Sequence, residues 1–424
     1  MIDQARMVRV LRLADLPWRA GKSLDPAAFA HLRRQLMLDC CKWDPQVGDV
    51  STLAPFPIIL GAGVWRRLSR WAEELAAEAA AAEAELLARP DLHATAGIPW
   101  RIRRVLRRAV TQPSAPAAAR IIRFDFHWTT DGWRISEANA DVPGGFTEAS
   151  SFAALMARHF PGTSPAGDPA VQLSRAIAHR VGTGGGVALL TAPGYMEDQQ
   201  VVAYLAGHFN RRGIRTHVCD PRQLRWRDGA AQLDCDRRRG PIDAIVRFFQ
   251  AEWLAGLPRR SGWPYLFVGG RTPLANPGSA ILIESKRFPM VWDNLCTRLP
   301  TWRRLLPVAR DPRTVNWRSG DDWVFKAAFC NTGDEVAMRS NLPARQWRKV
   351  VRSVFWRPRG WVAQRRFEPI ALATPLGLMN PCLGVYVIDG RAAGIYGRMT
   401  PGKIIDYSAI DVAVLVENDA EEIQ

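Results

Sequence analysis

Two short stretches place carboxylate, amide and guanidinium side chains where they could act on one ligand. Arg123 and Asp125 lie in RFDF, and Glu137, Asn139 and Asp141 alternate with other residues in SEANAD. A period of two is typical of a strand, whose successive side chains point to opposite faces. Because Glu, Asn and Asp are poor strand formers, a strand that aligns them on one face calls for a chemical reason.

The residues between the two stretches predict a β-hairpin. We expect a three-residue loop, Thr130-Asp131-Gly132, in which Gly132 carries a bulge. A loop one residue shorter would place Asp125 and Glu137 on opposite faces, so the bulge decides whether the two acids meet. The expected cross-strand pairs are Thr129 with Trp133, Asp125 with Glu137, Arg123 with Asn139, and Ile121 with Asp141.

This register has a chemical consequence. Two carboxylates about 5 Å apart across a ladder repel each other unless a cation lies between them. Asp125, Glu137 and Asn139 offer the hard oxygen ligands that Mg²⁺ prefers, and Mg²⁺ often completes its shell with substrate phosphates. Arg123 on the same face suits a phosphate oxygen. These residues leave one alternative open: a hairpin whose polar face is exposed to solvent and binds no ligand.

The net charge of +16 raises the question of nucleic-acid binding, but the basic residues are spread along the chain. Of the 57 basic residues 51 are arginine, which indicates a bias of the whole composition. Clusters at 101–108 and 237–239 are typical of solvated surfaces, so we do not expect nucleic acid as a partner. The six lysines are informative because a compact ammonium suits sites that a guanidinium does not; they are Lys22, Lys42, Lys286, Lys326, Lys349 and Lys403.

Size and composition bound the class of protein. A chain of 424 residues with 47% hydrophobic content can bury several cores. It has no apolar run of about 18–20 residues, no signal-peptide pattern and no paired cysteine motif. We therefore expect a cytoplasmic protein that does not bind membranes.

The elements that must hold these side chains follow from periodicity. Helices are predicted at 24–39, 64–89, 100–110, 147–160, 170–181, 197–212, 284–299 and 343–356. Strands alternate with helices between 186 and 249, which predicts a small α/β domain with a parallel sheet. Strands are also predicted at 322–329 and 360–368, with a hairpin at 382–401 turned at Asp389-Gly390.

The acidic motif resembles the glutathionylspermidine synthase family of circularly permuted ATP-grasp ligases. The resemblance rests on Arg-x-Asp, a strand turn, and Glu-x-Asn-Ala-Asp-x-Pro ahead of a helix with a Glu, and it extends over about 120–160 and 270–415. It implies an α+β ATP-grasp fold with a small α/β pre-ATP-grasp-like domain and a helical N-terminal region. The implied division is 1–115, 116–170, 171–275 and 276–424.

The resemblance also implies roles for individual residues. Asp125, Glu137 and Asn139 match the Mg²⁺ ligands, and Arg123 and Arg398 match arginines that contact the transferred phosphate. The ATP-binding matches are Lys286 after the Asn276-Pro277-Gly278 loop, Lys326 in WVFKAAF, Gln364 in WVAQRRF, and Lys403 just beyond Arg398. The scarcity of lysine and the motif therefore point to the same residues.

The implied reaction is ATP- and Mg²⁺-dependent ligation of a carboxylate and an amine through an acyl phosphate. The substrates would be a small acid or a peptide together with an amine acceptor. The chain departs from the family where Val142-Pro143-Gly144-Gly145 replaces Thr-Pro-Thr-Ser, so the family's own substrates do not carry over. An ATP-grasp phosphotransferase, a nucleotide-binding pseudoenzyme and a basic nucleic-acid-binding protein remain the alternatives.

Overall fold

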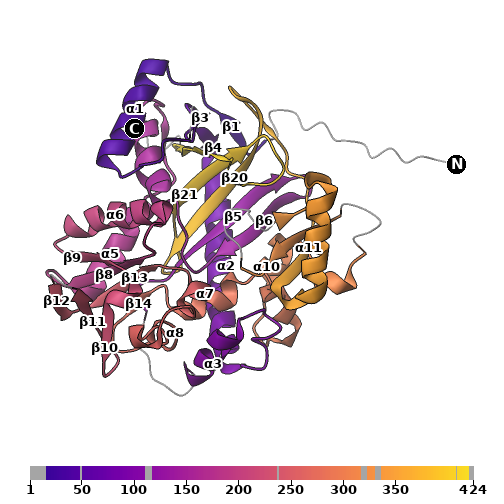
Figure 1. Cartoon of the computed structure of the whole chain (residues 1–424). Helices are drawn as coiled ribbons and strands as arrows, with labels where there is room; N and C mark the ends of the chain where they lie inside the picture. Colours follow the sequence, from indigo (N-terminus) through magenta and orange to yellow (C-terminus); the bar gives the residue numbers. More distant parts are fainter. Residues whose placement is uncertain are drawn as a thin grey trace.

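The computed structural model describes residues 16–47, 50–109, 117–235, 238–316, 322–329, 336–406 and 408–419. Over these residues, helices combine with several separate sheets into a mixed α and β fold (Figure 1). In the same residues no helix is long and apolar enough to cross a bilayer.

The largest sheet contains the acidic hairpin. Its strands follow the order β22-β21-β20-β5-β6, and β19 pairs with the start of β20. Asp389 and Gly390 both have positive φ in the turn between β20 and β21, as the Asp-Gly pair predicts. The strands are β5 (Ile121–Thr129), β6 (Gly132–Asn139), β19 (Leu372–Thr374), β20 (Gly377–Ile388), β21 (Arg391–Thr400) and β22 (Ile410–Val412).

A long helix, α2 (Ala62–Ala88), covers the apolar face of this sheet. Figure 1 shows it passing behind the strands, and it contacts β20 and β21. Leu75, Ala79 and Leu86 are buried, and the small alanine side chains let the helix lie close to the sheet. Three further helices contact α2: α3 (Trp100–Ala109), α9 (Ile281–Glu284) and α10 (Pro300–Leu305).

A smaller sheet joins the start of the described chain to its end. Its order is β1-β4-β23-β7, and β4 pairs in parallel with β23. These strands are β1 (Trp18–Ala20), β4 (Ile58–Leu60), β7 (Thr163–Pro165) and β23 (Val414–Glu417). Nearby elements are α1 (Pro26–Asp39), β2 (Gln46–Val47), β3 (Val50–Ser51), a π-helical turn at Glu148–Phe152 and α4 (Ala153–Ala157).

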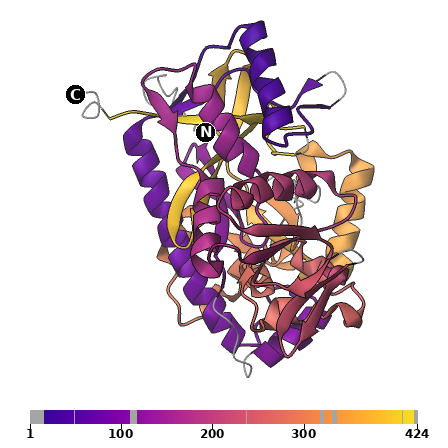
Figure 2. The same ribbon diagram turned by 90° about the vertical axis from the view of Figure 1, so that its left-hand side faces the viewer.

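The predicted parallel sheet is present in the order β14-β13-β8-β9, seen at the left of Figure 1 and facing the viewer in Figure 2. Its strands are β8 (Gly186–Thr191), β9 (Arg215–Cys219), β13 (Ala244–Phe248) and β14 (Leu274–Ala275). The helices are α5 (Pro169–Val181), α6 (Met196–Asn210), α7 (Ala251–Leu254) and α8 (Tyr265–Val268). An antiparallel ribbon adds β10 (Leu224–Arg227), β11 (Ala230–Cys235) and β12 (Arg238–Pro241).

A second antiparallel sheet lies opposite the acidic hairpin, in the order β15-β18-β16-β17. Its strands are β15 (Ala309–Arg310), β16 (Trp323–Ala327), β17 (Val336–Ala337) and β18 (Trp361–Arg365). The helix α11 (Ala344–Trp356) covers it, and Trp347 stacks on Phe325 with ring centroids 5.5 Å apart.

One predicted helix is wrong. Residues 284–299 do not form a single helix; α9 ends at Glu284 and a 3₁₀ segment covers Phe288–Asn294. Pro289 cannot donate a backbone hydrogen bond inside a helix, which accounts for the break. Lys286 therefore lies in a connection and not on a helix face, and its backbone N–H donates to the Ala328 carbonyl at 2.9 Å.

Candidate active site

The acidic hairpin has the predicted central pairing, but its loop length and the position of its bulge differ from the prediction. Asp125 pairs with Glu137, and Arg123 pairs with Asn139, as expected. The loop is one residue shorter than predicted, because Thr129 pairs with Gly132 and not with Trp133. The register shifts between Asp125 and Phe126, where Ser136 is the extra residue. The expected bulge at Gly132 is therefore wrong, and a bulge at Ser136 restores the pairing of the acids. The strand pairing ends at Asn139, so the expected pair of Ile121 with Asp141 does not form.

The sequence carried a signal for this bulge. Trp133 and Ile135 are buried at odd positions, whereas Ala138 and Ala140 are buried at even positions. A strand without an irregularity cannot bury odd positions first and even positions later on the same face. The change of parity between 135 and 138 locates the extra residue.

Asp125 lies in a network of cations and amides. Arg123 donates to both of its carboxylate oxygens at 2.8 and 3.1 Å, and Arg398 Nη2 donates to Oδ2 at 2.8 Å. Asn139 Nδ2 donates to the same Oδ2 at 3.2 Å. Burial alone would raise the pKa of Asp125, but the two guanidinium groups outweigh it and hold the pKa far below its usual range.

Two glycines make room for this network. Gly384 pairs with Asp125 across β20 and β5, and a Cβ there would lie 2.7 Å from Arg123 Cδ. Gly145 has a φ of +91°, and a Cβ there would lie 2.6 Å from the Tyr396 ring. The carbonyl of Gly144 accepts from Arg123 Nη1 at 2.7 Å. The Gly144-Gly145 departure from the family motif thus fits the backbone closely against this cluster.

Glu137 faces a lysine. Lys286 Nζ lies 3.2 Å from Glu137 Oε2 and 3.4 Å from Glu284 Oε1. Burial would raise the pKa of Glu137, but Lys286 and Lys326 more than offset it, so the pKa is lowered. Glu284 in turn accepts from the backbone N–H groups of Ala140 and Asp141, at 2.6 and 3.1 Å, which fixes the end of β6.

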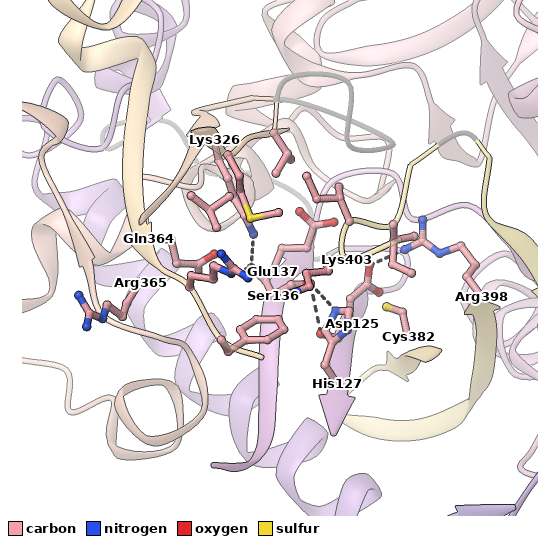
Figure 3. A pocket seen from close by; sticks show the side chains of 17 residues that line it. Asp125, His127, Ser136, Glu137, Lys326, Gln364, Arg365, Cys382, Arg398 and Lys403 are labelled. Carbon is pink, nitrogen blue, oxygen red and sulfur yellow. Dashed lines mark hydrogen bonds and ion pairs between the residues drawn. The ribbon is translucent and has the colours of Figure 1, made fainter. Parts of the chain in front are cut away.

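Lys326 and Gln364 reach the hairpin from the opposite sheet. The bulge leaves the Ser136 carbonyl turned out of the ladder, and Lys326 Nζ donates to it at 2.9 Å while Gln364 Nε2 donates at 3.4 Å. Both side chains are buried. Figure 3 shows them converging on Ser136 and Glu137 from one side of a cavity.

This first cavity lies between the two antiparallel sheets and holds about 760 Å³ of space, partly open to solvent. Besides Lys326 and Gln364, its walls include Asp125, Glu137 and Arg398. Its apolar lining comes from Val324, Val336, Met338, Phe367, Ile404 and Ile405. Lysines and arginines beside an apolar slot suit a ligand with both an anionic and a flat apolar part.

Lys403 and His127 also line the first cavity. Lys403 pairs with Glu368 at 3.1 Å, and its side chain is 51% exposed, so it stands at the rim. His127 was not among the predicted site residues; its Nε2 lies 3.1 Å from Ser136 Oγ. Burial lowers the pKa of His127 to about 4, so the imidazole is neutral at physiological pH.

We call Asp125 and its partners Arg123, Arg398 and Asn139 the Asp125 cluster. A second cavity of about 1300 Å³ lies on the other side of this cluster. It shares Glu137 and Arg398 with the first cavity and is bounded by Arg123, Asn139 and the Gly144-Gly145 loop. Its remaining charged residues are mostly acidic: Asp44, Glu148, Glu197, Asp198, Asp406 and Asp411, with Lys42. Burial, followed by repulsion from Glu197, raises the pKa of Asp198 to about 7.

Sequence reasoning missed the residues that anchor the hairpin. Arg247 is 2% exposed and binds the Asp141 carboxylate through Nη1 and Nη2, and the same carboxylate accepts from Ala251 N at 2.8 Å. Asn276 bonds the backbone of Ile121, Ala140 and Asp141. An arginine inside the apolar strand IDAIVRFF was the available signal, because a buried guanidinium requires a buried carboxylate.

The oxygen donors fit the expected Mg²⁺. Asp125, Glu137 and Asn139 carry oxygen donors of the kind that Mg²⁺ prefers and lie at the border of two cavities, with the Asn139 amide nitrogen donating to Asp125 Oδ2. In the described residues no group of three or more His, Cys, Asp or Glu side chains is arranged to hold a metal, so the set depends on the Asn139 amide. The carboxylates are balanced by Arg123, Arg398 and Lys286, which also suit phosphate oxygens.

Comparison with known proteins identifies the family and supports the fold. The family model described as glutathionylspermidine synthase preATP-grasp matches residues 62–417. A glutathione synthetase-like effector from Globodera pallida has a similar fold, with a TM-score of 0.61 at 12% identity over 92% of this chain and 97% of that one. A putative gamma-glutamylcysteine synthetase from Methylobacillus flagellatus aligns with a TM-score of 0.40 at 13% identity, over 75% of this chain and 82% of the other. No curated protein matches the sequence.

Proposed function

Because the chain belongs to the glutathionylspermidine synthase preATP-grasp family, we propose that it is an ATP- and Mg²⁺-dependent carboxylate–amine ligase. The supporting observation is that two chemically different cavities meet at Glu137 and Arg398. A ligase of this type must bring a nucleotide phosphate and a substrate carboxylate together while keeping their other parts apart.

The first cavity would take the nucleotide. Lys326 would neutralise phosphate oxygens from the wall of this cavity, and Lys286 would do so from an adjoining pocket that shares Lys326, Glu137 and Gln364 with it. The apolar lining that includes Val324, Val336 and Met338 would hold the base, with Gln364 beside it and Lys403 at the rim. Asp125, Glu137 and Asn139 would hold Mg²⁺, which neutralises and orients phosphate oxygens when bound.

The arginines would act on the transferred phosphoryl group. Arg398 lines both cavities, and its buried Nε has no hydrogen-bond partner among the described residues, so it retains a donor. Arg123 lines the second cavity and would contact the phosphoryl group from that side. Catalysis of this step consists of positioning and of stabilising charge that develops in the transition state.

The second cavity would hold the acid and the amine. The substrate carboxylate would attack the γ-phosphorus, releasing ADP and forming an acyl phosphate. The amine nitrogen would then attack the acyl carbon, phosphate would leave, and a proton lost from the nitrogen would complete the amide. The excess of carboxylates in this cavity favours an amine, which carries positive charge before it reacts.

A nucleotide-binding scaffold without ligase activity is the second candidate. It is favoured by the bonding of Asp125, whose oxygens already accept from Arg123, Arg398 and Asn139. If this network does not open for Mg²⁺, ATP binds and no turnover follows.

Purified protein with ATP and Mg²⁺ tests both candidates. We expect ADP release with at least one pair from a panel of amino acids or short peptides combined with amines, and calorimetric binding of ATP that strengthens with Mg²⁺. ATP binding with no ADP across the panel would favour the scaffold. Absence of ATP binding would reject both.

A further inference from the structure

Lys42 is a buried lysine for which the proposed reaction gives no role. It is 4% exposed, and its Nζ lies 3.0 Å from Asp44 Oδ1, 2.6 Å from Glu148 Oε1 and 3.0 Å from Asp411 Oδ2. Three carboxylates thus form ion pairs with one ammonium group, and Asp411 Oδ2 accepts a hydrogen bond from it. We call Asp44, Glu148 and Asp411 the carboxylate cage.

The cage belongs to the wall of the second cavity, where all three carboxylates and Lys42 are exposed to the interior. Tyr396 connects it to the reaction centre: its hydroxyl donates to Asp411 Oδ1 at 2.7 Å, and its ring lies 5.2 Å from the guanidinium carbons of both Arg123 and Arg398. A ligand that fills the cavity from the Asp125 cluster therefore ends near this cage.

The lysine itself is a feature of this chain's N-terminal segment. Lys42 lies before residue 62, where the family match begins, whereas Glu148 and Asp411 lie inside the match. In a chain with 51 arginines, the cage holds one of only six lysines. A tetrahedral ammonium can meet three carboxylates from three directions, which a planar guanidinium cannot do in the same space.

A second observation indicates that the cavity receives a hydrogen-bond donor. Gln250 also lines it and is 5% exposed, yet its Oε1 has no hydrogen-bond partner among the described residues. A buried acceptor without a partner is costly unless a ligand supplies the donor.

We propose that the carboxylate cage is an alkylammonium-binding site and that Lys42 is its resident occupant. By filling the cage with its own ammonium group, the chain fixes the length of the second cavity and removes a position at which an acceptor could place a second positive charge. Lys42 is therefore a specificity-determining residue: acceptors are bound through a single amine. The statement about acceptors rests on the proposed ligase function; the statement about the cage does not.

Chemical complementation tests the cage without nucleotide. Lys42→Ala removes the atoms of a propylammonium ion, so propylammonium should bind this variant and raise its thermal midpoint by about 1.5 °C at ten times its Kd. Calorimetry should find one site. The wild type and the matched variant Lys22→Ala, which removes an exposed lysine, should show neither effect, and neutral 1-propanol should not replace propylammonium.

Further variants keep the test decisive. If Lys42→Ala folds only with propylammonium, the cage is supported. Lys42→Ser, whose small side chain also leaves this space open, serves where Lys42→Ala is too unstable, and Asp411→Asn combined with either should weaken propylammonium binding at least about tenfold. If both lysine variants fail to fold at every propylammonium concentration, or fold without binding it, the proposal is wrong.

A ligation assay with two amine acceptors distinguishes failure of this inference from failure of the proposed function. In the ligation assay, wild type should use a monoamine and the diamine of equal length with kcat/KM values within about threefold, and Lys42→Ala should favour the diamine by about tenfold. Propylammonium binding without any turnover would reject the ligase and keep the cage. Turnover with unchanged acceptor preference would reject Lys42 as a specificity determinant.

Discussion

The first and second cavities share Glu137 and Arg398 but differ in charge. The first is lined by five basic and two acidic residues together with an apolar slot, whereas the second is lined by three basic and seven acidic residues. In a chain with a net charge of +16, the acidic cavity is a local departure from the composition. The contrast teaches that the Asp125 cluster divides an anion-binding region from a region that favours amines.

The pKa values of two side chains, one in each cavity, reflect the same difference in charge. In the first cavity burial lowers the pKa of His127 to about 4, and Lys326 and Arg398 add to that effect. In the second cavity burial and Glu197 raise the pKa of Asp198 to about 7. Each group thereby loses charge of the sign that already prevails around it.

The largest effect is expected from removing the negative charge of Asp125, which lies between the two cavities. Asp125→Asn removes a carboxylate that balances Arg123 and Arg398 and that the proposal assigns to Mg²⁺. We expect kcat to fall by about 10³-fold or more, and unfolding free energy to fall by about 3 kcal/mol. Steady-state ADP release and denaturant unfolding measure the two effects. Asp131→Asn, in the turn of the same hairpin, is the control; activity within a few-fold of wild type for Asp125→Asn would contradict the role.

Removing a cation from the first cavity should weaken nucleotide binding selectively. Lys326→Ala takes away a charge assigned to ATP phosphate and the bond to the Ser136 carbonyl. We expect KM for ATP to rise by about 10- to 100-fold with little change in KM for the amine. Lys349→Ala, on α11 at an exposed position, is the matched lysine control. Equal effects on both substrates would show that the cavities are not separate.

His127 should make stability depend on pH in a defined direction. Its pKa is about 4 when folded and about 6.5 when unfolded, so the unfolded chain takes up a proton first as pH falls. The stabilising effect is complete above pH ~6.5 and is lost towards pH ~4, by up to about 3 kcal/mol. We expect His127→Gln to remove this part of the slope in chemical denaturation. Parallel curves for wild type and variant would exclude the neutral buried imidazole.

Asp198 should give the smallest effect, on acceptor binding. Because its pKa is raised to about 7 and an ammonium group favours its ionised form, the acceptor KM should fall as pH rises from 6 to 8. Asp198→Asn should flatten that profile, changing KM by less than about tenfold at pH 8. A profile that persists in the variant would assign the titration to another group.

Local patterns in the sequence predict most elements that carry the site. The alternation in SEANAD gives the pairing of Asp125 with Glu137, and the Asp-Gly turn gives the hairpin of β20 and β21. The predicted position of the bulge is wrong because turn chemistry at Gly132 does not by itself fix the register; the change of parity between Ile135 and Ala138 places the extra residue at Ser136. Pattern and turn geometry must agree before a register is fixed.

What the sequence could not predict depends on contacts between distant residues. Lys42 and Asp411 are 369 positions apart, and Arg247 reaches Asp141 across 106 positions. The apolar strand around Arg247 indicates that it is buried, but the sequence does not identify Asp141 as its partner, and Lys42 and Asp411 resemble surface residues until the fold brings them together. The roles of Lys286, Lys326, Gln364 and Arg398 remain predictions because they concern a ligand and not the chain alone. The domain boundaries also remain predictions.

Trapping of an acyl phosphate tests the central claim most directly, because it needs no knowledge of the amine. Purified protein is incubated with ATP, Mg²⁺, hydroxylamine and a panel of amino acids and short peptides, and acyl hydroxamate is measured together with ADP. The proposed ligase predicts hydroxamate and ADP in equal amounts for at least one acid, and neither product from Asp125→Asn. ATP binding with no hydroxamate and no ADP from any acid would contradict it.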